Sequence, residues 1–219
     1  MRSWNLPSRP RGLIFDLDST LYEHPAYARF QTGVLVERLA AERGEALEVT
    51  QALLAKMREE RRRLGEADTS LGNLSLALGV PIETSVAWRE ELIHPEEWLG
   101  PDARLDEALT ALAGNFPLGL VTNNPRSIAL SSLEALGVRR HFSCVIGLDD
   151  TGHSKPDPAP FALASRRLNL PPAALISIGD REDVDIRPAL ALGMGGLLIS
   201  TIGEVYELPS FLSLPISRT

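Results

Sequence analysis

Five short apolar runs, each ending in a small or polar residue, impose the strongest constraint on how this chain of 219 residues folds. The runs are Gly12–Asp16, Leu118–Thr122, Ser143–Gly147, Leu175–Gly179 and Gly196–Ser200. From the second run onward a stretch with helical spacing lies in each interval, and glycine or proline ends it, at Gly137, Pro171 and Gly193. Short apolar strands that alternate with helices predict an α/β fold built on a Rossmann-like parallel sheet.

The first interval breaks this alternation, because about a hundred residues separate Asp16 from Leu118, whereas a crossover between parallel strands needs little more than a dozen. Four segments of the interval show helical spacing: Tyr27–Arg43, Ala46–Leu64, Leu71–Leu78 and Glu83–Ile93. We therefore predict that residues 23–97 form an inserted α-helical domain. Residues 1–22 and 98–219 would together form the α/β core.

The charge balance and the cysteine count exclude several classes of protein. A net charge of -7 argues against binding a nucleic-acid polymer, because such proteins present a basic face. The single cysteine, Cys144, excludes an intramolecular disulfide and a zinc site built on several thiolates. No apolar run approaches the ~20 residues of a membrane helix, and none before the first predicted strand is typical of a secretory signal. We expect a cytoplasmic protein with no membrane partner.

Polar residues follow four of the predicted strands, at the edge of an open α/β sheet where ligands bind. They are Asp16 and Asp18 after the first strand, Thr122 and Asn123 after the second, Lys155 after the third, and Asp180 and Asp185 after the fourth. Lys155 is one of only two lysines among 22 basic residues, and its compact ammonium suits a phosphate-binding position. The sequence predicts that acids, a hydroxyl and one cation gather at this edge.

These residues resemble the four motifs of the haloacid dehalogenase-like hydrolase superfamily, in the same order and on the expected elements. The motifs here read Asp16-x-Asp18-x-Thr20, Thr122, Lys155 and Gly179-Asp180-x-x-x-x-Asp185. The insertion at 23–97 resembles the small α-helical (C1-type) cap of the phosphatases in that family. Two segments, Asp18–Tyr22 and Leu64–Leu74, are more loosely similar to the pyrimidine 5'-nucleotidase-like branch.

The residue types suit phosphoryl transfer. A carboxylate at Asp16 can attack phosphorus and form an aspartyl-phosphate, which divides one difficult displacement into two easier ones. Asp18 could protonate the departing oxygen and then activate the hydrolytic water. Thr122, Asn123 and Lys155 would bind the phosphate. The resemblance implies that Mg²⁺ is the cofactor, held by the Asp16 carboxylate, the Asp18 backbone carbonyl, Asp180 and Asp185.

The substrate expected from this chemistry is a small phosphorylated metabolite, such as a nucleotide or a sugar phosphate. The acid at Asp18 favours phosphate esters over dehalogenation, because a halide needs no proton on leaving. Two alternatives remain open: a phosphomutase of the same superfamily, and a non-catalytic regulatory protein on the same fold. For the oligomeric state we expect a monomer or a homodimer.

Overall fold

The computed structural model describes residues 1–65 and 71–213, and it contains one six-stranded sheet. The strands are β1 (Arg2–Trp4), β2 (Gly12–Phe15), β3 (Leu118–Val121), β4 (Phe142–Ile146), β5 (Leu175–Gly179) and β6 (Gly195–Leu198). Their order in the sheet is β1-β6-β5-β2-β3-β4, and every neighbouring pair is parallel except β1 with β6. The predicted Rossmann-like α/β fold is confirmed.

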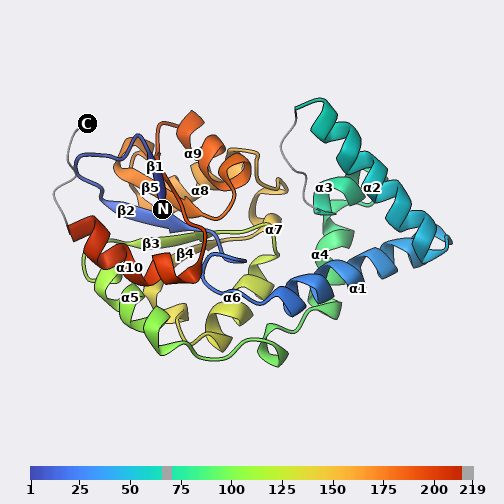
Figure 1. Cartoon of the computed structure of the whole chain (residues 1–219), viewed down its shortest axis with the longest axis horizontal. Helices are drawn as coiled ribbons and strands as arrows, with labels where there is room; N and C mark the ends of the chain where they lie inside the picture. Colours follow the sequence, from blue (N-terminus) through green and yellow to red (C-terminus); the bar gives the residue numbers. More distant parts are fainter. Residues whose placement is uncertain (66–70, 214–219) are drawn as a thin grey trace.

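Helices cover both faces of this sheet (Figure 1). They are α5 (Ala103–Ala113), α6 (Arg126–Ala135), α7 (Leu148–Thr151), α8 (Ala159–Leu168), α9 (Arg187–Ala191) and α10 (Ile202–Ser213). Successive side chains of a strand point to opposite faces, so Phe15 joins a core with α5, α6 and α10, whereas Ile14 joins a second core with α8 and α9. This burial on both sides explains why the strands read as unbroken apolar runs.

The long first interval is helical, as predicted. It contains α1 (Pro25–Arg43), α2 (Leu47–Arg63), α3 (Leu71–Ala77), α4 (Ile82–Leu92) and a short 3₁₀ turn, Pro95–Glu97. Figure 1 shows these helices grouped to one side of the sheet, with α4 beside α6 and α7. One bond across this boundary joins Ser127 Oγ to Glu90 Oε1 at 2.6 Å. The exact division at 23–97 stays a proposal.

The chain leaves and re-enters the core through one aromatic cluster. His24 accepts a hydrogen bond from the Tyr27 amide and so caps α1, while Trp98 lies on the returning segment. The Trp98 ring stacks on Tyr27 with centroids 5.5 Å apart, and Phe30 and His24 contact the same ring. Aromatic pairs of this kind contribute about 0.5–1.5 kcal/mol beyond the area they bury. The cluster therefore fixes the inserted helices where both connections meet the sheet.

Sequence patterns missed three of the strands and α-helices, namely β1, α7 and α10. β1 is a strand of three residues, Arg2–Trp4, with no apolar run, and it exists because it pairs with the edge of β6. The amphipathic helix α10 was not predicted either, although Val205 and Leu208 are fully buried against the sheet. Among residues 1–65 and 71–213, no helix has the length and apolarity needed to span a membrane.

Gly179, at the end of β5, offers a test of how closely the sheet and the following turn approach each other. A Cβ at this position would lie 2.4 Å from Cβ of Asp185, far inside van der Waals contact. We expect Gly179→Ala to lower the free energy of unfolding by about 1–3 kcal/mol, the usual cost of overpacking. Urea denaturation measures the change.

Gly114→Ala is the matched control, since a Cβ there meets nothing closer than 3.6 Å and the backbone φ is −65°. Its stability should stay within about 1 kcal/mol of the parent protein, in the range of helix propensities. Equal stability of the two variants would refute the close approach.

Candidate active site

The segments that follow β2, β4 and β5 place three of the predicted site residues in contact. Asp16 directly follows β2, and its amide donates to the Ile178 carbonyl of neighbouring β5 at 2.9 Å. Lys155 Nζ lies 2.6 Å from Asp16 Oδ1 and 2.6 Å from Asp185 Oδ1. The lysine side chain is 2% exposed, so both ion pairs are shielded from water. An ammonium thus bridges the two acids from different strands.

The electrostatics of this trio depend on burial. Burial alone would lower the pKa of Lys155, but the two adjacent carboxylates outweigh it and raise that pKa, so the side chain stays charged. Burial is also the largest cause that raises the pKa of Asp16, to about 7. Asp185 and Asp18 add to this increase, while Lys155 opposes it. Burial and the neighbouring acids thus disfavour the ionised form of Asp16, and the ammonium of Lys155 favours it.

Asp180 extends the acidic cluster. Burial and then the charge of Asp185 raise the pKa of Asp180 to about 6. Each of Asp16, Asp180 and Asp185 offers a carboxylate oxygen, and these oxygens lie within 4.8 Å of one another. Three carboxylates held this closely, with Lys155 paired to only two of them, fit a divalent cation that prefers oxygen ligands.

Hydrogen bonds hold both carboxylate oxygens of Asp185 in place. Oδ1 accepts from Lys155, and Oδ2 accepts from the Arg181 amide at 3.0 Å. Its backbone carbonyl accepts from Ser177 Oγ of β5 at 2.8 Å. Gly179 has no Cβ, so the Asp185 side chain can lie against the Gly179 backbone without a clash. The π-helical turn Glu182–Ile186 therefore holds its acid beneath the end of the sheet rather than at the surface.

The Asp18 carboxylate is surrounded by hydrogen-bond donors. Tyr22 donates its hydroxyl to Asp18 Oδ1, and Asn124 Nδ2 donates to Oδ2 at 2.9 Å. Gln31 Nε2 of α1 lies 3.4 Å from Oδ1. Its neighbours are thus two core residues and one residue of the inserted helices. The carboxylate is not part of the cluster formed by Asp16, Asp180 and Asp185.

The two polar residues that follow β3 organise the same edge. Thr122, which is buried, accepts at Oγ1 from the Asn124 amide at 3.2 Å. Asn123 accepts at Oδ1 from the Lys155 amide at 2.7 Å and donates through Nδ2 to the Lys155 carbonyl at 3.2 Å. The Asn123 side chain therefore holds the Lys155 backbone through two hydrogen bonds, and the ammonium of this lysine contacts Asp16.

Sequence reasoning did not single out Tyr22, Gln31, Asn124 or Arg89 for this site. Asn124 follows two predicted residues, and that position was the one available signal. Arg89 of α4 is buried, and its guanidinium donates to the carbonyl of Ser85, one turn earlier, at 3.0 Å and to its hydroxyl. Burial lowers the pKa of Arg89 to about 10, and the charge of Asp18 partly opposes this. Nothing in the spacing of α1 or α4 showed which side chains face the sheet.

Known proteins match this chain over most of its length. The family model described as haloacid dehalogenase-like hydrolase matches residues 10–193. A phosphoglycolate phosphatase of Shigella boydii is 32% identical over 203 residues, which cover 84% of this chain and 78% of the relative. The phosphoglycolate phosphatase of Escherichia coli K12 is 31% identical over 201 residues, with the same coverage.

Solved structures share the fold at lower identity. A phosphatase from Thermococcus onnurineus has a TM-score of 0.62 at 22% identity, covering 92% of this chain and 97% of its own. A 2-haloacid dehalogenase from Pseudomonas syringae has a TM-score of 0.59 at 23% identity, covering 93% and 98%. The four motif regions, the sheet that assembles them and the match along most of the sequence lead to one conclusion: the chain belongs to the haloacid dehalogenase-like hydrolases.

Proposed function

We propose that this protein is a Mg²⁺-dependent phosphatase that hydrolyses a small phosphomonoester through an aspartyl-phosphate on Asp16. The contact of Lys155 with Asp16 at 2.6 Å, beside the clustered carboxylates of Asp180 and Asp185, carries the proposal. The relatives named phosphoglycolate phosphatase support phosphoester hydrolysis and make phosphoglycolate the first substrate to test. A cytoplasmic location and a monomeric or homodimeric state stay predictions.

The reaction would proceed in two displacements. An oxygen of the Asp16 carboxylate attacks phosphorus, the ester P–O bond breaks, and the alcohol departs with a proton from Asp18. Water then attacks the aspartyl-phosphate, Asp18 takes a proton from that water, and the phosphoryl–Asp16 bond breaks to release inorganic phosphate. The first step leaves Asp16 phosphorylated and Asp18 deprotonated, and the second step restores both groups, so Asp16 and Asp18 end as they began.

Asp18 suits the acid–base role because its two oxygens are held by different donors. Tyr22 and Asn124 fix the carboxyl plane, while Gln31 brings the inserted helices to the same group. A general acid or base must be positioned within hydrogen-bond reach of the proton it moves, and such catalysis contributes about 10²–10⁴-fold. These contacts supply that positioning.

The remaining core residues would bind and neutralise the phosphoryl group. Lys155 contributes a charge that is already desolvated, so its interaction with an anion is strong. Thr122 contributes a hydroxyl from the end of β3. Asn123, whose amide holds the Lys155 backbone, would act mainly by positioning that lysine.

The acidic cluster fits Mg²⁺ by the nature of its donors. Carboxylates of Asp16, Asp180 and Asp185, with the Asp18 backbone carbonyl, would hold the ion. When bound, it would neutralise charge between the nucleophile and the phosphate. We further propose that residues 23–97 form a cap that covers the substrate and excludes water during attack.

Replacing the nucleophile tests the first displacement. We expect Asp16→Asn to reduce turnover of p-nitrophenyl phosphate by about 10³-fold or more, because a neutral amide cannot attack phosphorus. The fold should persist by circular dichroism. Glu182→Gln is the control, since that acid at the same edge forms an exposed pair with Arg187. Normal activity of the asparagine variant would exclude Asp16 as the nucleophile.

Leaving groups of different basicity test Asp18. An alkoxide needs a proton on departure far more than a phenolate does, so Asp18→Asn should slow an alkyl phosphate by about 10²–10⁴-fold. Hydrolysis of p-nitrophenyl phosphate should fall less. Equal losses on both substrates, measured as kcat/KM, would contradict an acid role.

Chelation tests the cation. Because Asp16, Asp180 and Asp185 bring three carboxylate oxygens together, we expect EDTA to abolish turnover and added Mg²⁺ to restore it. Asp180→Asn should raise the Mg²⁺ concentration needed for half-maximal activity by about tenfold or more. Activity that survives exhaustive chelation would refute the metal requirement.

A further inference from the structure

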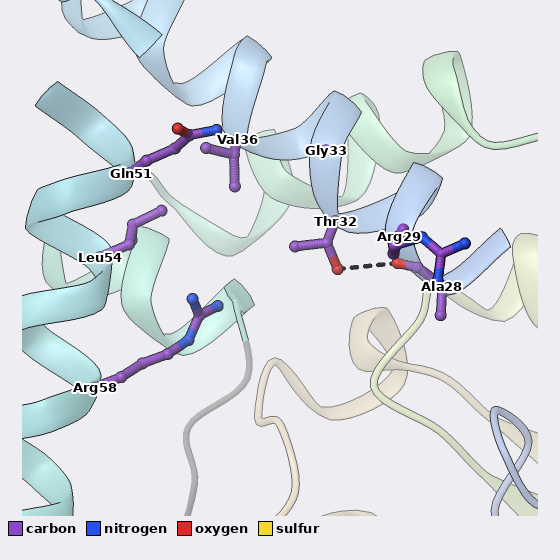
Figure 2. Close-up of a pocket in the computed structure, with 8 residues that line it drawn as sticks. All are labelled: Ala28, Arg29, Thr32, Gly33, Val36, Gln51, Leu54 and Arg58. Atoms are coloured by element: carbon purple, nitrogen blue, oxygen red, sulfur yellow. Dashed lines mark hydrogen bonds between the residues drawn. The ribbon is translucent and has the colours of Figure 1, made fainter. Parts of the chain in front are cut away.

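The inserted helices contain a pocket that the proposed reaction does not yet use. A cavity of about 460 Å³ lies between α1 and α2. Figure 2 shows Leu54 and Arg58 projecting from α2 toward the side of α1 that carries Thr32 and Val36. The walls are therefore mixed, with apolar side chains beside a guanidinium, a hydroxyl and the amide of Gln51.

A second hollow lies between this pocket and the catalytic edge. A second cavity, of about 370 Å³, is lined by Asp18 and Ser19 of the core and by Ala28 of α1. Ala28 also lines the pocket between α1 and α2, so the two hollows adjoin along one face of α1. A ligand that filled both hollows would lie along this helix and pass Ala28.

The arginines of the pocket differ from the other arginines of these helices. On α2, Arg62 and Arg63 each lie 3.1 Å from an oxygen of Glu59, and Arg43 of α1 lies 2.7 Å from Glu45. Within residues 1–65 and 71–213, neither Arg58 nor Arg29, which lines the pocket from α1, has an ion pair or a hydrogen bond through its side chain. Arg58 is nevertheless half-buried.

A shortage of acidic residues in the insertion does not explain why Arg29 and Arg58 lack an acidic partner among the described residues. Residues 23–100 hold nine basic residues against fourteen acidic ones, so acidic partners are abundant. A guanidinium that faces a pocket without a carboxylate keeps its fork of donors available for a ligand. That fork matches a carboxylate or a phosphate group through two parallel hydrogen bonds.

We propose that this pocket binds a second anionic group on the leaving group, which would make the substrate a phosphomonoester of an alcohol that carries a carboxylate or another phosphate. Arg58 is the principal recognition residue, and Arg29 adds positive charge at the edge. This inference rests on the proposed phosphatase function and specifies its substrate class.

The helix geometry sets the length of that leaving group. Ala28, Thr32 and Val36 follow one another at intervals of one turn along the pocket face of α1, and one turn rises about 5.4 Å. A leaving group that reaches from Asp18 past Ala28 to Thr32 would therefore span about one turn of the helix.

Steady-state kinetics on three substrates test the proposal. p-Nitrophenyl phosphate carries no second anion, 2-phosphoglycolate carries a carboxylate, and fructose 1,6-bisphosphate carries a second phosphate. For the wild type, at least one of the latter two should exceed p-nitrophenyl phosphate in kcat/KM. Arg58→Gln should reduce that preference on the order of tenfold, mainly through KM, as expected for a lost charge-assisted contact. Arg58→Lys should recover part of it.

Arg62→Gln on the same helix is the matched control, because Arg62 faces solvent and pairs with Glu59; its preference should equal that of the wild type. The substrate whose advantage in kcat/KM is lost in Arg58→Gln shows whether the second anion is a carboxylate or a phosphate. Unchanged preference in both Arg58→Gln and Arg29→Gln would overturn the inference, as would a wild type that prefers p-nitrophenyl phosphate. A wild type inactive on all three substrates would instead refute the proposed phosphatase function.

Discussion

The contact of the buried Lys155 ammonium with two carboxylates is the interaction on which the rest of the site depends. It joins Asp16 at the end of β2 to Asp185 in the turn after β5, and both distances are 2.6 Å. A buried charge is tolerated only when it is paired, and here the pairing is shared among residues far apart in the sequence. Loss of Lys155 would leave two carboxylates without their counter-charge, and loss of either acid would remove one of the two partners of the ammonium.

The sheet order explains how this contact arises. β2 and β5 are parallel neighbours, with Phe15 opposite Ile178, so the residues that follow both strands emerge at the same edge. Gly179 lets the Asp185 side chain approach the strand closely, and Asn123 after β3 holds the Lys155 backbone. Three separate connections thus meet at one ammonium. The sheet order brings these residues close together, and local hydrogen bonds orient their side chains.

The inserted helices meet the core through the aromatic cluster around Trp98 and, closer to the site, through polar contacts. Gln31 reaches Asp18 from α1, and Glu90 of α4 reaches Ser127 of α6. The cavity lined by Asp18 and Ala28 lies at this boundary, whereas the pocket between α1 and α2 lies within the inserted helices. The looser resemblance to the pyrimidine 5'-nucleotidase-like branch rested partly on residues 66–70, which lie outside the described residues. The proposed substrate preference depends instead on Arg29 of α1 and Arg58 of α2.

The sequence by itself determined the sheet, the helical insertion and the strand ends that carry acids and a lysine, because periodicity and position along a strand are local properties. It did not reveal β1, whose polar residues are strand only through pairing with β6. Only the tertiary structure decided that Lys155 lies between Asp16 and Asp185, that Asn124 and Tyr22 hold Asp18, and that Arg58 faces a pocket. These arrangements depend on which side chains of different elements come into contact. Helical spacing predicts which face of a helix is buried, but not which element packs against that face.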